Sequence, residues 1–164
     1  MKAILAFISA ICSLAAVATT YNWVGGKSTI WNLTDANWTT AGVQGNCAFV
    51  AGGDAIFDLN DSLSLKFGAQ VRPETVSATV AANKTLTFDF TNSGNQFFST
   101  TTTIEKKGTG TVYFYRPNVS SYGTGDFPAD SILDIQKGVV IISSRNKGGL
   151  CAPKNIVLHS GTTL

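Results

Sequence analysis

Three tryptophans near the start of the chain are the residues whose type and spacing could most readily do chemistry. Trp23, Trp31 and Trp38 fall within 16 residues, and the flat face of an aromatic ring can stack on a sugar ring. The spacing therefore predicts a candidate glycan-contacting platform. The same rings could instead seal one end of a hydrophobic core, because each brings about 150–250 Å² of surface to bury. We favour the seal and keep the platform as the alternative.

Other reactive side chains are sparse. Asp54, Asp58, Asn60 and Asp61 form the densest acidic cluster, and hard oxygen ligands of this kind suit calcium. The spacing of an EF-hand loop is missing, however, and an Asx-rich turn accounts for the same residues. His159 is the only histidine, and we expect it to be an exposed strand residue. We predict no catalytic residue, no metal site and no cofactor.

Two further patterns are too incomplete to support chemistry. Gly26, Lys27 and Ser28 match the tail of a phosphate-binding loop, but Tyr21 stands where the first glycine of that loop is needed. A polysaccharide lyase would need a basic residue beside an acidic cluster, and the sequence places no arginine there. A nucleotide site and a lyase site are therefore not favoured.

The first 18 residues predict export. Lys2 precedes an apolar stretch at 3–17, and Ala16-Val17-Ala18 supplies the small residues that signal peptidase requires. We expect cleavage after Ala18 and a secreted, extracellular or outer-membrane-surface location. Membrane contact is expected only through this leader or through a region that follows the present sequence.

The charge of the chain argues against a polyanionic partner. The formal net charge is +2, and removal of the leader lowers it to about +1 by taking away one lysine. Nucleic-acid binding needs clustered basic residues. The one adjacent basic pair, Lys106-Lys107, is expected to be a solvated turn. We predict no nucleic-acid partner and an extracellular glycan or cell-surface ligand as the candidate partner.

Short alternating segments separated by turns must position all of these residues. Apolar and polar residues alternate with the period of a β-strand, and no long helical stripe follows the leader. The predicted strands are 63–67, 76–80, 86–90, 112–114, 133–135, 139–142 and 156–158. The chain therefore predicts an all-β fold.

Recurring corners indicate how these strands are arranged. Asn83, Gly108, Gly138 and Gly161 each stand just before a strand, at intervals of 25, 30 and 23 residues, and each can adopt a positive φ at little cost. A period in this range is typical of a solenoid. The longest interval contains 116–130, which is rich in Pro, Gly, Ser and Asp and predicts a loop.

A solenoid is favoured over an antiparallel sandwich. Sandwiches commonly use Asn-Gly or Asp-Gly hairpin turns, and neither dipeptide occurs in the chain. We predict a right-handed parallel β-helix. Because Gly161 to Leu164 reads as the start of another strand with no polar cap after it, we expect the chain to be the N-terminal portion of a longer protein.

Several motifs resemble the autotransporter-associated β-strand repeat proteins of bacteria. The repeat motifs are 107–112 (KGTGTV), 122–124 (YGT), 132–141 (ILDIQKGVVI) and 157–164 (VLHSGTTL), and the opening motifs are 23–26 (WVGG), Trp31, 37–38 (NW) and 53–58 (GDAIFD). The resemblance covers most of residues 21–164. It implies a right-handed parallel β-helix with a cell-surface or extracellular role, and it implies no catalytic residue.

We predict three regions: a signal peptide at 1–18, a Trp-rich N-terminal cap at 19–62 and β-solenoid coils at 63–164. The predicted function is that of a secreted or cell-surface solenoid passenger segment with a structural or adhesive role and no catalysis. An extracellular glycan-binding module or a fragment of a β-helix polysaccharide lyase is the alternative.

The cysteines test this arrangement. Neighbouring coils stack about 4.8 Å apart, so Cys47 and Cys151, three or four coils apart, should be separated by about 15–19 Å. A disulfide needs Cα atoms within about 7 Å. A simple solenoid therefore predicts two unbridged thiols.

Overall fold

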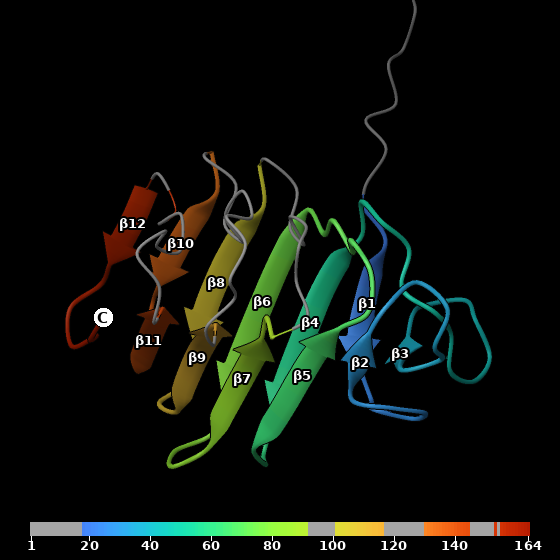
Figure 1. Ribbon diagram of the computed structural model, residues 1–164, viewed down its shortest axis with the longest axis horizontal. Coiled ribbons are helices and arrows are strands. Elements are labelled where there is room, and N and C mark those ends of the chain that lie inside the picture. Colours follow the sequence, from blue (N-terminus) through green and yellow to red (C-terminus); the bar gives the residue numbers. More distant parts are fainter. Residues whose placement is uncertain (1–17, 92–100, 117–129, 145–152, 154) are drawn as a thin grey trace, which may run out of the picture.

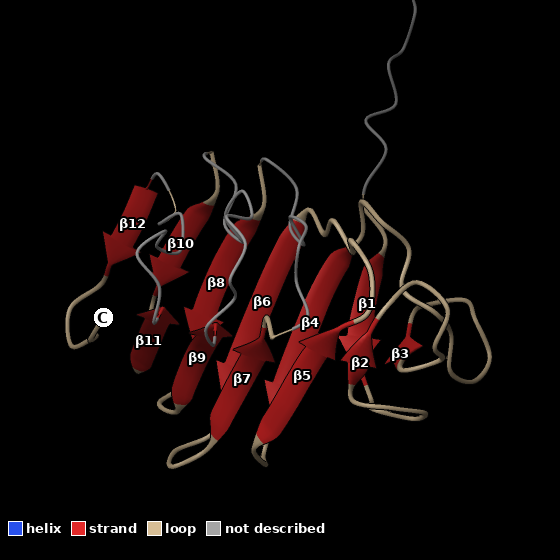
Figure 2. Ribbon diagram, in the orientation of Figure 1, coloured by secondary structure: helices blue, strands red, loops and turns tan. Residues whose placement is uncertain are grey.

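The computed structural model describes residues 18–91, 101–116, 130–144, 153 and 155–164, and in these residues the fold is all-β (Figure 2). No described residue forms a helix, and the described chain has no helix that could span a membrane. The strands are β1 (Thr20–Trp23), β2 (Ile30–Trp31), β3 (Trp38–Thr39), β4 (Asp54–Leu59), β5 (Leu63–Phe67), β6 (Thr75–Val80), β7 (Thr85–Asp89), β8 (Thr103–Lys107), β9 (Thr111–Arg116), β10 (Ile132–Ile135), β11 (Val139–Ser144) and β12 (Asn155–Leu158).

The strands form two sheets between which the chain alternates. Sheet A has the order β12-β10-β8-β6-β4-β1-β3, and sheet B has the order β11-β9-β7-β5-β2. From β4 onward, each strand pairs in parallel with the strand two positions along the chain. We call a strand of sheet A together with the strand of sheet B that follows it one coil. Figure 1 shows successive coils following one another along the long axis. The predicted all-β fold with parallel strands is confirmed.

The parallel stacking begins earlier than the predicted start of the coils at residue 63. β1 already pairs in parallel with β4 through Tyr21 and Ala55, and β4 pairs with β6. β3 is the exception, since it runs antiparallel to β1 at the end of sheet A. Residues 19–62 therefore contain both parallel strands and an irregular end.

Glycine at the corners allows the coils to stack closely. Asn83, Gly108, Gly138 and Gly161 all have φ between 60° and 84°, which confirms the four corners that the sequence predicts. A Cβ on Gly138 would lie 2.6 Å from the carbonyl oxygens of both Gly108 and Gly110. The corners therefore use both properties of glycine, the left-handed backbone and the absence of a side chain.

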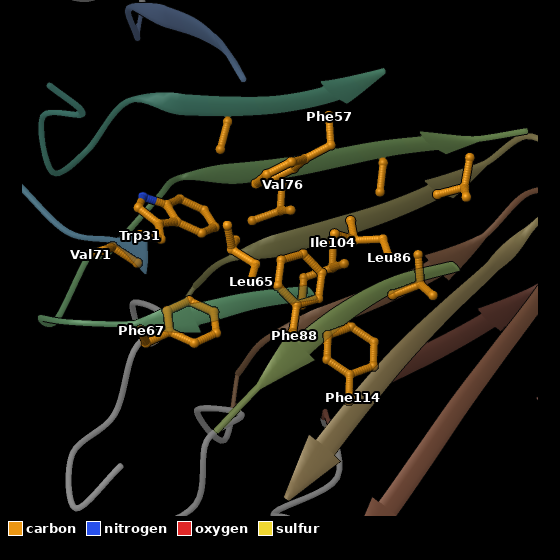
Figure 3. Close-up of a cluster of buried hydrophobic side chains, with 14 of the residues drawn as sticks. Trp31, Phe57, Leu65, Phe67, Val71, Val76, Leu86, Phe88, Ile104 and Phe114 are labelled. Atoms are coloured by element: carbon orange, nitrogen blue, oxygen red, sulfur yellow. The ribbon is translucent and has the colours of Figure 1, made fainter. Parts of the chain in front are cut away.

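The interior is filled by side chains in register between coils. Along sheet A, Ala55, Val76, Ile104 and Leu133 follow one another as direct partners. Along sheet B, the phenylalanines stack: the ring centroids of Phe67 and Phe90 lie 4.9 Å apart and those of Phe88 and Phe114 lie 5.3 Å apart. These residues are buried, and Figure 3 shows Phe67, Phe88 and Phe114 among the side chains of the core. Burial of each of the valine, isoleucine, leucine and phenylalanine side chains is worth about 1.5–3 kcal/mol of transfer free energy.

The two edges of the coil stack differ in the length of their connections. The connections from sheet A to sheet B are short: three residues at 60–62, four at 81–84, three at 108–110 and three at 136–138. The connections from sheet B back to sheet A are longer, at 68–74, 90–102, 117–131 and 145–154. We call these sides the short-turn edge and the long-connection edge. Of the predicted loop at 116–130, Arg116 is the last residue of β9, and residues 117–129 lie outside the described part of the chain.

Candidate functional site

The richest polar cluster lies on the outer face of sheet A. Alternation along β8 and β10 points Glu105 and Asp134 outward, because Ile104 and Leu133 are buried. Parallel register then sets Glu105 directly beside Asp134. We name as the outer row the set Ser77, Glu105, Lys107, Asp134, Gln136 and His159.

Hydrogen bonds and ion pairs link the outer row along the stack. The Lys107 ammonium lies 2.7 Å from Oε2 of Glu105 and donates a hydrogen bond of 3.1 Å to the hydroxyl of Ser77, one coil earlier. Nε2 of His159 lies 2.8 Å from Oδ1 of Asp134. Gln136 donates to the other oxygen of that carboxylate at 2.8 Å. One group of contacts thus joins β6 to β8, a second joins β10 to the residue that follows β12, and Glu105 and Asp134 lie side by side in register between the two groups.

Two carboxylates in neighbouring coils raise the question of glycoside hydrolysis, which uses one carboxyl as an acid and a second as a nucleophile or base. In this structure Glu105 accepts from an ammonium and Asp134 accepts from an amide and lies against an imidazole. Both carboxylates are thus held by neighbouring side chains of the outer row.

The pairing of Asp134 with His159 is a contact that the sequence reasoning missed. His159 is exposed, as predicted, and it directly follows β12. The signal was present in the sequence, since 25 residues separate the two side chains and this is the spacing of one coil. Applying the corner period to the polar residues as well as to the glycines would have revealed it.

The three tryptophans gather at the N-terminal end of the core. The centroid of Trp38 lies 5.0 Å from that of Trp23 and 5.1 Å from that of Trp31, and Trp31 contacts Phe49 at 5.2 Å. Trp31 and Trp38 have no exposed surface, whereas Trp23 is half-buried. This is the arrangement of a hydrophobic seal. A glycan contact at the tryptophans stays a prediction, and for Trp31 and Trp38 it would require the rings to leave the core.

A buried asparagine explains the conformation of the segment that resembles a phosphate-binding loop. Oδ1 of Asn37 accepts hydrogen bonds from the backbone N–H groups of Lys27 and Ser28, both at 2.8 Å. Its Nδ2 donates to the hydroxyl of Ser28 and to the carbonyl of Ile30. The two N–H groups that would face a phosphate are therefore occupied within the chain.

The acidic cluster is dispersed. Asp58, Asn60 and Asp61 are exposed and Asp54 is half-buried. Oδ1 of Asp61 lies 3.2 Å from the ammonium of Lys84 in the next turn. Within the described ranges, no three His, Cys, Asp or Glu side chains are placed to hold a metal ion together.

Lys106 contradicts the expectation of a solvated lysine pair. It occupies an inward position of β8 between Ala78 and Ile135 and has no exposed surface. Its ammonium donates to the carbonyl oxygens of Lys107, Gly108 and Lys137 at 2.7, 2.8 and 3.0 Å. Burial lowers the pKa of Lys106 to about 8. The alternation that makes Ile104 an inward residue was the missed signal, because Lys106 stands two positions further along the same face.

The outer face of sheet B carries a pair of neighbouring tyrosines. Tyr113 and Tyr115 point outward from β9, their centroids lie 5.6 Å apart, and both are half-buried. The hydroxyl groups of Tyr113 and Ser143 lie 2.8 Å apart. Thr87 and Asp89 are the register partners of the two tyrosines in the preceding coil. The face therefore combines ring surface with hydroxyl and carboxylate groups.

Cys47 carries a free thiol, as predicted, and is half-buried next to the antiparallel bridge with Trp38. Cys151 lies outside the described residues.

Comparison of the chain with protein-family models, with curated proteins and with solved structures finds no match.

Proposed function

We propose that the chain is a secreted or cell-surface passenger segment, a right-handed parallel β-helix with a structural and adhesive role and no catalysis. In this role the stacked coils form a stiff support. The long-connection edge presents its segments to an extracellular glycan or a cell-surface ligand. The proposal rests on the leader at 1–18 and on the resemblance to autotransporter-associated repeat proteins.

The difference between the two edges is the observation that carries this proposal. Turns of three or four residues form one side of the stack, while longer connections of varied length form the other. Corners such as Gly108 and Gly138 are too crowded for a side chain, so the short-turn edge is under steric constraint. Binding residues are commonly carried by loops on a rigid scaffold.

Replacing residues 118–128 with a Gly-Ser segment of equal length tests the proposal. We expect cells or beads that display the chain to lose adhesion to glycan-coated and cell-derived surfaces, while the thermal unfolding midpoint is unchanged. Lys84→Ser is the matched control, because Lys84 lies in a short turn at the opposite edge.

Unchanged adhesion after replacement of each long connection in turn would refute the assigned role of this edge. Loss of adhesion with Lys84→Ser as well would point to a general surface effect.

A glycan-binding module remains the second candidate, and the outward pair Tyr113 and Tyr115 favours it. Pull-down with insoluble cellulose, chitin and xylan tests this function. We expect binding to be lost in Tyr113→Ala and retained in Tyr113→Phe, because the phenylalanine keeps the ring. Absence of binding to every one of these polysaccharides would remove the candidate.

A further inference from the structure

The chain carries five triplets of the form Asn-x-Ser/Thr, the acceptor sequence for N-linked glycans. The triplets begin at Asn32, Asn37, Asn60, Asn83 and Asn118. None of them has proline in the middle position, where it would block modification. Asn118 lies outside the described residues, and the structure describes the other four triplets.

Asn60 and Asn83 occupy equivalent positions in successive coils. Leu63 and Leu86 are register partners in β5 and β7, and each follows its asparagine by three residues. Both triplets therefore lie on the short-turn edge, one where β4 turns into β5 and the other where β6 turns into β7 (Figure 1).

The remaining residues of the two triplets are in contact across the coils. The ammonium of Lys84 lies 3.2 Å from Oδ1 of Asp61, so the middle residues face one another. The N–H of Thr85 donates a hydrogen bond of 3.1 Å to the hydroxyl of Ser62, so the last residues meet as well. The same kind of acceptor triplet is thus repeated in register along one edge of the stack.

The carboxamides of Asn60 and Asn83 are accessible. Both residues are exposed, and neither side chain has a hydrogen-bond or ion-pair partner among the described residues. A φ of 60° gives Asn83 a structural role at its corner, because asparagine adopts this backbone conformation more readily than most residues. Asn60 has no positive φ, so backbone geometry does not explain why asparagine stands there as well.

The two earlier triplets are closed by their own hydrogen bonds. Asn37 is fully buried, and its Nδ2, the atom to which a glycan is attached, donates to the hydroxyl of Ser28 at 3.1 Å and to the carbonyl of Ile30 at 3.0 Å. Asn32 is half-buried, and its Oδ1 accepts from both the N–H and the hydroxyl of Thr34. The hydroxyl that completes this triplet is therefore engaged with the asparagine itself.

We propose that Asn60 and Asn83 are acceptor sites for N-linked sugars and that Asn32 and Asn37 are not. In the modification, Nδ2 of the asparagine attacks the anomeric carbon of a sugar that is activated on a phosphate leaving group. A C–N bond forms, the phosphate leaves with the electrons of its bond to the anomeric carbon, and Nδ2 releases one proton. The sugars coat the short-turn edge and leave the long-connection edge bare. The inference shares with the proposed function only the expectation of export, because N-linked sugars are typical of secreted proteins.

Transfer of glucose to the purified, folded chain tests the four sites. The chain carrying Asn118→Gln is incubated with UDP-glucose and a glycosyltransferase that recognises Asn-x-Ser/Thr, and the products are mapped by peptide mass spectrometry. We expect one hexose on Asn60 and one on Asn83, and none on Asn32 or Asn37.

The fold should select the sites from among equal triplets. Synthetic peptides spanning 28–41, 57–66 and 80–88 lack the folded structure, and all four asparagines should accept glucose in them. If the peptides accept glucose at the two short-turn sites and the folded chain does not, the proposal is overturned. Transfer to Asn37 in the folded chain, at the level seen in its peptide, would overturn the selection by burial and hydrogen bonding.

Two substitutions and one natural residue serve as controls. Ser62→Ala should abolish transfer to Asn60 in the folded chain, whereas Ser62→Thr should retain it, because threonine keeps the hydroxyl. Asn46 is exposed but has no Ser or Thr two positions later, so it should stay unmodified. Circular dichroism confirms that each variant is folded.

Secretion from yeast with the chain's own leader is the cellular test, again in the Asn118→Gln background. Peptide N-glycosidase should lower the mass of the secreted chain, and it should not change the mass of the variant with both Asn60→Gln and Asn83→Gln. A secreted chain that carries no glycan at either asparagine would overturn the proposal. A chain that stays in the cell with its leader attached would refute the proposed export, and the transfer assay would still decide the acceptor sites.

Discussion

The ammonium group of Lys106 donates a hydrogen bond to the backbone carbonyl of Lys137, 31 residues later and one coil further along the stack. Two more bonds, to the carbonyls of Lys107 and Gly108, complete its three donors. Those carbonyls belong to the same two corners that Gly108 and Gly138 allow to approach one another. A buried cation therefore joins successive corners from inside the core.

Lys106→Met is expected to change how stability depends on pH. Burial lowers the pKa of Lys106 from 10.5 to about 8, so above pH 8 the folded chain releases a proton that the unfolded chain still holds. The free energy of unfolding should then rise between about pH 8 and 10.5 through this group, by at most about 3 kcal/mol. Below pH 8 both states are protonated, and the cost of burying the charge is fully present.

Urea unfolding of both proteins across this range measures the effect as a difference between the parent and Lys106→Met. Lys107→Met is the control, because Lys107 points outward and its side chain is 41% exposed. If the free energy of unfolding depends on pH in the same way for the parent and for Lys106→Met, the prediction is wrong.

Gly138→Ala should destabilise the fold by at least about 3 kcal/mol. The residue has a φ of 84°, and the new Cβ would lie 2.6 Å from two carbonyl oxygens of the preceding corner. Gly161→Ala separates backbone strain from steric crowding, because Gly161 also has a positive φ, of 80°, but a Cβ there would meet no atom within 4 Å. It should cost only about 1 kcal/mol. If thermal or urea unfolding shows that Gly138→Ala and Gly161→Ala lose equal amounts of stability, crowding at the corner is unimportant.

Trp31→Ala should destabilise the N-terminal end of the core by about 3–5 kcal/mol, the usual cost of truncating a buried aromatic residue. Trp23→Ala should cost less, about 1–2 kcal/mol, because Trp23 is half-buried. Urea unfolding followed by tryptophan fluorescence and near-UV circular dichroism gives both values. Loss of binding to a glycan array without unfolding in Trp31→Ala would favour the platform over the seal.

Export in a bacterial host should yield a protein that begins at Thr19. Mass spectrometry of the secreted material measures this, and Ala16→Leu combined with Ala18→Leu should keep the leader attached because large residues block signal peptidase. Recovery of a secreted protein that still contains residues 1–18 would refute the predicted cleavage.

The repeating part of the fold could be predicted because local chemistry determines it. The two-residue alternation in segments such as 76–80 identifies the buried face of a strand, and the four corner residues need a positive φ whatever the rest of the chain does. These two features repeat with a similar period, so together they also indicate parallel stacking.

The candidate site was less predictable because it depends on contacts between coils. The outer row exists only once Asp134 and His159 are set one coil apart. Lys106 was mistaken for a solvated residue because lysine is seldom fully buried. The antiparallel pairing of β1 with β3 follows from the packing of the tryptophans and has no periodic signal in the sequence.

The contrast between the short-turn edge and the long-connection edge bears on how such a chain can diversify. An added residue in a short corner would have to fit against the backbone of the neighbouring corner, where even a Cβ on Gly138 would lie 2.6 Å from two carbonyl oxygens. An added residue in a long connection is absorbed before the next strand begins. Insertions and foreign epitopes should therefore be tolerated along a single flank, which makes that flank the natural place for antigenic variation and for grafted peptides.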